Sequence, residues 1–76
     1  MTTENEKTEL VELGANIERI RKEKKWRLNY LAGITEIEVR QLRRIEKGLV
    51  DLKTTTLLKI IWALEVDAND ILPKNQ

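Results

Sequence analysis

Apolar residues recur at intervals of three and four along most of this chain, which is the spacing of helices that bury one face. No stretch shows the strict alternation of apolar and polar residues that predicts a strand. The spacing predicts five short helices: residues 9–24, 26–34, 38–47, a fourth that is capped by one of Thr54, Thr55 or Thr56 and ends near Leu64, and a last turn from Asp67 to Pro73. The sequence therefore predicts an all-α fold.

Residues at the predicted helix ends support this division. Thr8 is a candidate N-cap of the first helix, and Gly48 can adopt the positive φ that often ends a helix. The first eight residues show no apolar periodicity. We therefore expect a flexible N-terminal tail at residues 1–8, one helical domain at residues 9–73 and a C-terminal tail at residues 74–76.

Charge is divided unevenly between two parts of the chain. Residues 19–47 contain 10 Lys and Arg against 4 Asp and Glu, a net charge of +6. The other residues hold the remaining 4 basic and 9 acidic side chains, so the total of +1 conceals a basic region. Positive charge gathered over neighbouring helices predicts a polyanionic partner.

The residue types that are missing narrow the range of functions. The chain has no Cys and no His, which removes thiolate metal sites and the commonest general base. It also has no nucleophile–base pair and no glycine-rich phosphate loop, so we expect neither an enzyme nor a bound cofactor, metal or small-molecule ligand. No apolar run approaches the roughly 20 residues that cross a membrane, and the polar start is unlike a signal peptide, so we expect a cytoplasmic protein.

Several short motifs follow one another at regular intervals. They are the helix end Ile17–Lys25 with its basic run, the pair Leu31-Ala32, Ile37, the run Ile45-Glu46-Lys47-Gly48, and the segments Leu57-Leu58-Lys59-Ile60 and Ala63-Leu64-Glu65-Val66. Because these motifs occur in this order and at these intervals, the chain resembles the lambda-repressor-like (XRE-type or Cro-type) helix-turn-helix DNA-binding family over residues 13–72. The resemblance implies a second helix across the phosphate backbone and a third helix in the major groove of duplex DNA.

The resemblance also implies a role for individual residues. The implied base contacts, from the third helix, are Val39, Arg40, Gln41, Arg43 and Arg44. The implied phosphate contacts are Arg27, Lys47, Lys53 and Thr54. A structural ion pair is implied between Arg21 and Glu46. For the other cations of the run 19–27, stabilisation of a helix C-terminus is an equally good interpretation.

The chain departs from the family pattern at three positions near the turn. Leu28 stands where a polar phosphate contact is common, and Glu36 stands where the turn usually has Gly. Glu38 brings an acid to the start of the third helix, where it would repel a phosphate or accept a hydrogen bond from a cytosine amine. These departures keep a second hypothesis open: a protein-interaction module or antitoxin on the same fold, with weak or no DNA binding of its own.

Trp62 lies one position off the apolar stripe of its helix, and we favour a dimer seam over a side chain folded on its own helix. The seam candidates are Leu49, Val50, Trp62 and Ile71. A homodimer would bind two half-sites of a palindromic operator about one helical turn apart. The leading hypothesis is therefore a sequence-specific transcriptional regulator, expected to be a repressor, that binds double-stranded DNA.

Overall fold

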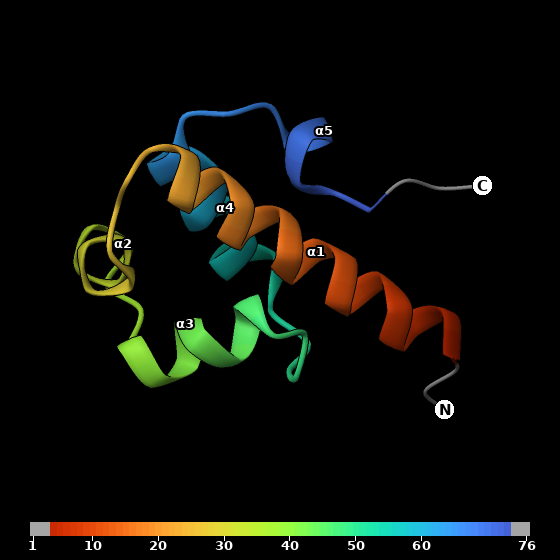
Figure 1. The fold of residues 1–76 in the computed structure, drawn as a ribbon. Helices are drawn as coiled ribbons and strands as arrows, with labels where there is room; N and C mark the ends of the chain where they lie inside the picture. Colours follow the sequence, from red (N-terminus) through yellow and green to blue (C-terminus); the bar gives the residue numbers. More distant parts are fainter. Residues whose placement is uncertain (1–3, 74–76) are drawn as a thin grey trace.

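The computed structural model describes residues 4–73, with side chains from residue 8 onward. This part of the chain is helical and contains no strand, as predicted. The helices are α1 (Glu4–Glu23), α2 (Leu28–Thr35), α3 (Val39–Glu46), α4 (Thr54–Leu64) and α5 (Ala68–Ile71). Figure 1 shows α3 along the lower edge of the molecule, with α1 and α4 above it and no element below it.

Two helix starts differ from the prediction. The first helix begins at Glu4 rather than at residue 9, so Thr8 lies inside it and residues 4–8 of the predicted tail are helical. Residues 4–8 contain neither Gly nor Pro, and acids in the first turns favour the positive end of a helix, although no apolar stripe marks them. The second helix begins at Leu28 rather than at residue 26. The rest of the predicted tails, residues 1–3 and 74–76, lies outside the described residues.

The predicted threonine cap of the fourth helix is also wrong. Lys53, with extended backbone, occupies the N-cap position, and Thr54 is the first helical residue. Asp67 precedes α5 as predicted but forms no capping hydrogen bond through its side chain. Both helices are therefore positioned by packing of their apolar faces rather than by a polar cap.

Each of the first four helices is followed, within two residues, by a residue with positive φ. Gly48 has φ 72°, as predicted, whereas the others are Lys25, Glu36 and Glu65 with φ of 62°, 61° and 57°. In three of the four cases, the residue that follows the positive-φ position donates its amide to the carbonyl five residues earlier. These hydrogen bonds run from Trp26 to Arg21, from Ile37 to Ala32 and from Leu49 to Arg44, at 3.0–3.1 Å. This closure satisfies terminal carbonyls and turns the chain sharply, which offsets the cost of about 1–2 kcal/mol for a left-handed L-residue.

One apolar cluster holds the helices together. The longest helix, α1, packs against α3, α4 and α5, while α2 packs against α3 and α4. The buried members are Leu13, Ile17, Ile20, Leu31, Ala32, Leu42, Ile45, Ile60, Ile61, Leu64 and Ile71. The exposed fraction of Ile71 is 0%, and Asn16 Nδ2 donates to its carbonyl at 2.9 Å, so α5 is fastened to α1. The prediction that Ile71 contributes to a dimer seam is therefore wrong.

Gly14 allows α1 and α3 to approach each other closely. A Cβ at this position would overlap the carbonyl oxygens of Ile45 and Glu46 and lie 2.7 Å from the carbonyl carbon of Glu46. These atoms belong to the backbone at the end of α3 and cannot rotate away. The absence of a side chain at Gly14 therefore sets how close α3 lies to α1.

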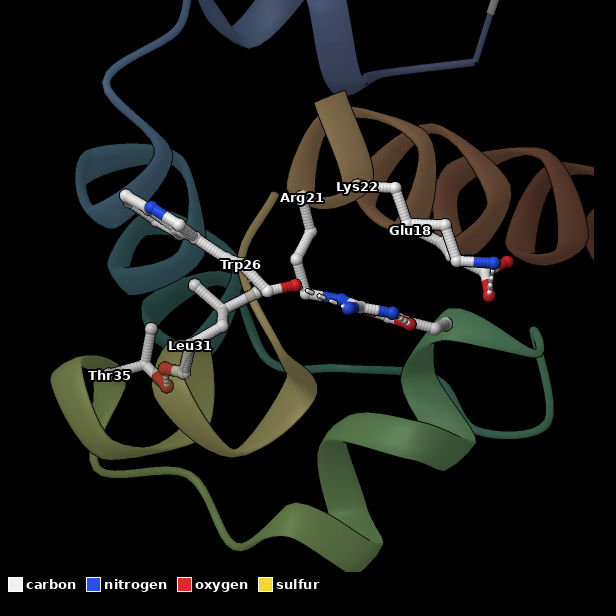
Figure 2. A network of polar contacts seen from close by, with 7 residues as sticks. Glu18, Arg21, Lys22, Trp26, Leu31 and Thr35 are labelled. Atoms are coloured by element: carbon white, nitrogen blue, oxygen red, sulfur yellow. Dashed lines mark hydrogen bonds and ion pairs between the residues drawn. The ribbon is translucent and has the colours of Figure 1, made fainter. Parts of the chain in front are cut away.

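A buried ion pair fixes the same end of α3. Arg21 Nε and Nη2 donate to the two carboxylate oxygens of Glu46 at 2.8 and 3.0 Å, and Arg21 Nη1 donates to the Trp26 carbonyl at 2.8 Å. The exposed fractions of Arg21 and Glu46 are 8% and 7%. Figure 2 shows the Arg21 side chain extending from α1 toward α3, with Trp26 beside it. One guanidinium thus joins α1, the link to α2, and the last residue of α3.

The ion pair also has an electrostatic signature. The hydrogen bonds to Glu46 raise the pKa of Arg21 above its ordinary value, against the opposing effect of burial. A raised pKa stabilises the folded state at every pH below the ordinary value and ceases to do so only above the raised value. The contribution of the Arg21 guanidinium to stability is therefore constant across neutral pH.

We expect Gly14→Ala to lower the free energy of unfolding by about 1–3 kcal/mol, because the added methyl group overlaps fixed backbone atoms. Gly33→Ala is the matched control, since a Cβ there meets nothing within 4 Å and alanine favours a helix interior. It should raise stability by about 0.5–1 kcal/mol. Urea denaturation of both variants measures the difference, and equal stability of the two would contradict the close approach.

We expect Arg21→Ala to lower the free energy of unfolding by about 3 kcal/mol, because it leaves the Glu46 carboxylate buried without its partner. Arg19→Ala removes an exposed guanidinium 3.4 Å from Glu23 and should change stability by less than about 0.5 kcal/mol. Thermal and urea unfolding measure both variants. An unchanged unfolding midpoint for Arg21→Ala would refute the structural role of the pair.

Candidate nucleic-acid interface

The outward side of α3 is the most basic surface of a single helix in the described chain. The buried side consists of Leu42, Ile45 and Glu46. At about 100° per residue, Arg40 and Arg44 lie one turn apart on the opposite side. The exposed residues from the helix to its C-cap are Arg40, Gln41, Arg43, Arg44 and Lys47. The helix therefore carries its apolar contacts inward and its guanidinium groups outward.

The cations of α3 differ from those of α1 in their partners. Arg40, Arg43 and Arg44 form no salt bridge with any side chain that the structure describes. In α1, by contrast, the pairs are Arg19–Glu23, Arg21–Glu46 and Lys22–Glu18. The exposed positive charge of α3 is therefore not neutralised within the described chain.

The basic run at the end of α1 separates into two groups. Arg19, Arg21 and Lys22 belong to the pairs just described, and Lys24 Nζ lies 5.2 Å from the centre of the Trp26 ring. Lys25 and Arg27 are exposed and form no salt bridge with a described side chain. These two residues are the ones in the run whose charge is available to a ligand.

The predicted base contacts do not share one environment. Arg40 and Arg44 occupy the centre of the exposed side, and Arg43 and Gln41 flank them. Val39 is the first residue of α3, is half-buried, and packs against the core. Any contact between Val39 and a ligand would therefore use only part of its side chain.

The predicted phosphate contacts all lie at helix ends. Arg27 and Lys53 are the N-cap residues of α2 and α4, Thr54 is the first residue of α4, and Lys47 is the C-cap of α3. All four are exposed. Neither N-cap forms a side-chain capping hydrogen bond, so amides at these two helix starts remain open to an anion.

Sequence reasoning missed one polar residue near this surface. Asn29, in the first turn of α2, is exposed and lines a concave surface with Glu36, Glu38 and Val39. No apolar spacing or charge marks an isolated amide, and only the turn between the helices brings it to the start of α3. Leu28 is half-buried against the core, so its side chain does not replace the polar residue common there.

The structure separates the predicted seam candidates. Trp62 is 68% exposed and shares a concave surface with Ile34, Glu36 and Lys59, near the turn that precedes α3. Leu49 is 64% exposed and follows α3 at its other end, next to Gly48, whose added Cβ would meet Val11 of α1. Val50 is half-buried against the core. Leu49 and Trp62 therefore lie on separate apolar surfaces.

Two other kinds of site are absent from residues 4–73. None of the helices there has both the length and the apolar character needed to cross a membrane. Within the same residues, no three His, Cys, Asp or Glu side chains form a group that could hold a metal ion.

Comparison with known proteins identifies the family. The fold is similar to that of the restriction-modification controller protein C.AhdI from Aeromonas hydrophila, with a TM-score of 0.81, 20% sequence identity, and coverage of 86% of this chain and 98% of that chain. A comparison with curated protein sequences gave no match. The family model of the Cro/C1-type helix-turn-helix DNA-binding domain matches residues 16–73, which is more than half of the chain. As the motifs predicted, the chain belongs to the Cro/C1-type helix-turn-helix DNA-binding family.

Proposed function

We propose that this protein is a sequence-specific transcriptional regulator that binds double-stranded DNA with α3 in the major groove. The observation that carries the proposal is the outward side of α3, where Arg40 and Arg44 are exposed without acidic partners on a helix fixed by the core and by Glu46. Family membership supports the same function. The relative with the same fold, C.AhdI, is a controller protein of a restriction-modification system.

The dimensions of α3 suit this role. An α-helix with its side chains is about 10–12 Å in diameter, and the major groove of B-form DNA is about 12 Å wide. We assign Arg40, Arg43 and Arg44 to base edges, where arginine donates to O6 and N7 of guanine, with Gln41 and Val39 at the margins. We assign Arg27, Lys47, Lys53 and Thr54 to phosphates, because helix ends and their open amides bind anions.

We further propose that two copies bind the two halves of a palindromic operator and repress by occupying it. A single α3 offers few base contacts, and a two-fold pair doubles the interface. Trp62 and Ile34 are the preferred seam, because an exposed tryptophan beside a second apolar side chain is typical of protein interfaces. Lys59 and Glu36 border the same surface, so a two-fold arrangement can oppose their charges.

Selection of bound sequences from random duplexes tests the function directly, and we expect an inverted repeat. On the selected duplex, Arg44→Ala should weaken binding by about 1–3 kcal/mol and should weaken binding to random DNA much less. Arg19→Ala, which removes an equal charge from α1, serves as the control. For a dimer that touches ~6–8 phosphates, the logarithm of the association constant should fall with the logarithm of salt at a slope near −5 to −7.

Two outcomes would contradict parts of this proposal. An equal loss on selected and random DNA would mean that Arg44 contacts the backbone rather than a base. If the protein retains no duplex even at low salt, where non-specific binding is strongest, the DNA-binding proposal fails and the protein-interaction module is favoured.

We expect Trp62→Glu to convert the dimer into a monomer, because a two-fold seam would bring two buried carboxylates together. Leu49→Glu introduces the same charge at a residue of similar exposure, on the other apolar surface, and should remain a dimer. Sedimentation velocity over a range of concentrations distinguishes the two states. If only Leu49→Glu dissociates, the seam lies at the C-terminal end of α3 instead.

A further inference from the structure

The side chain of Glu38 lies at the leading end of α3 without a hydrogen bond or salt bridge inside the described chain. It occupies the N-cap position with extended backbone, φ −60° and ψ 142°, and its side chain forms no capping hydrogen bond. It is exposed and forms no salt bridge with any described side chain, although three arginines follow it closely. The carboxylate is therefore held by no specific contact, and its contribution to stability is limited to its attraction to the positive end of α3.

The surroundings of Glu38 leave it open to a ligand. It lines the concave surface between the starts of α2 and α3, together with Asn29, Gly33 and Val39. The space beside Gly33 is open, since an added Cβ there would meet nothing within 4 Å. In helix-turn-helix complexes the N-terminal residues of the recognition helix contact base edges. If α3 enters the major groove as proposed, the Glu38 carboxylate is among the first groups to meet a base pair.

The chemistry of a carboxylate limits what it can bind in that place. An ionised carboxylate only accepts hydrogen bonds, and it is repelled by phosphates and by the acceptor edges of guanine and thymine. The donors in the major groove are the N4 amine of cytosine and the N6 amine of adenine, and the usual partner of Glu is the cytosine amine. Resting on the function proposed above, we infer that Glu38 is a specificity-determining residue that selects cytosine at the base pair met by the start of α3.

The neighbouring arginine makes this selection sharper. Arg40, two residues further on, donates to guanine, whereas Glu38 accepts from cytosine, so the two side chains read opposite hydrogen-bonding characters. Where a guanine or thymine edge stands in that place, the carboxylate faces acceptors and phosphates and stays unpaired, which weakens binding. Glu38 thus lowers affinity for non-cognate DNA as well as favouring the cognate base.

Selection from random duplexes with the wild type, Glu38→Gln and Glu38→Ala tests the inference. The wild type should select cytosine at one position of each half-site, with roughly 5- to 100-fold discrimination against other bases. Glu38→Gln should change that position to adenine, because Gln pairs with N6 and N7 of adenine, and Glu38→Ala should leave it without preference. The other positions should be unchanged, and both variants should bind random DNA several-fold more tightly than the wild type.

Asp51→Asn is the matched control, because it removes an equal charge from an exposed residue in the loop beyond the other end of α3. It should tighten binding to random DNA without changing any selected base. If the wild type selects a defined sequence and the Glu38 variants select the same bases at every position, the inference is overturned while the proposed function stands. If the wild type binds no duplex, both fail together. Thermal unfolding of each variant confirms that the exposed substitutions leave the fold intact.

Discussion

The contact of Arg21 with Glu46 is the interaction on which the arrangement of this molecule depends. The third helix is eight residues long and buries only Leu42 and Ile45 as apolar anchors, which is little to fix its rotation. Two hydrogen bonds from the Arg21 guanidinium to both oxygens of Glu46 restrict this rotation further. A third hydrogen bond, to the Trp26 carbonyl, joins the same guanidinium to the link between α1 and α2. Because burying two charges is costly unless their hydrogen bonds are satisfied, this geometry is effectively all-or-none. Together with the burial of Leu42 and Ile45, it fixes which side of α3 faces outward.

The basic region consequently serves two purposes that a count of charges cannot distinguish. In α1, cations are paired with Glu18, Glu23 and Glu46, and the buried pair with Glu46 stabilises the scaffold. In α3, the arginines have no acidic partner among the described side chains, so their charge is directed outward. Paired and unpaired arginines thus lie on two helices in direct contact. The proposed DNA-binding surface follows from this division, because rigid support below leaves the outer groups free to meet a ligand.

Much of the fold could be predicted because its information is local. Apolar residues spaced three and four positions apart predict the inner sides of the helices, and Gly48 predicts the end of α3. The start of α1 at Glu4 carries no such mark, since a solvated helix turn needs no apolar residue. The burial of Ile71 depends on where α5 docks, which periodicity does not report. The pairing of Arg21 with Glu46 spans 25 residues, so spacing could not predict it, and only the family resemblance implied it. Asn29 was missed for the same reason: a tertiary turn brings it beside α3.

NMR of the guanidinium Nε–H groups most directly distinguishes Arg21, which supports the fold, from Arg40 and Arg44, which are proposed to contact DNA. In the free protein, Arg21 should give a sharp, slowly exchanging signal, because both ends of its guanidinium are held in buried hydrogen bonds. Addition of a selected duplex should leave that signal in place and should produce new, protected signals from Arg40 and Arg44. A large shift of the Arg21 signal on DNA binding, with no change at Arg40 and Arg44, would contradict the account.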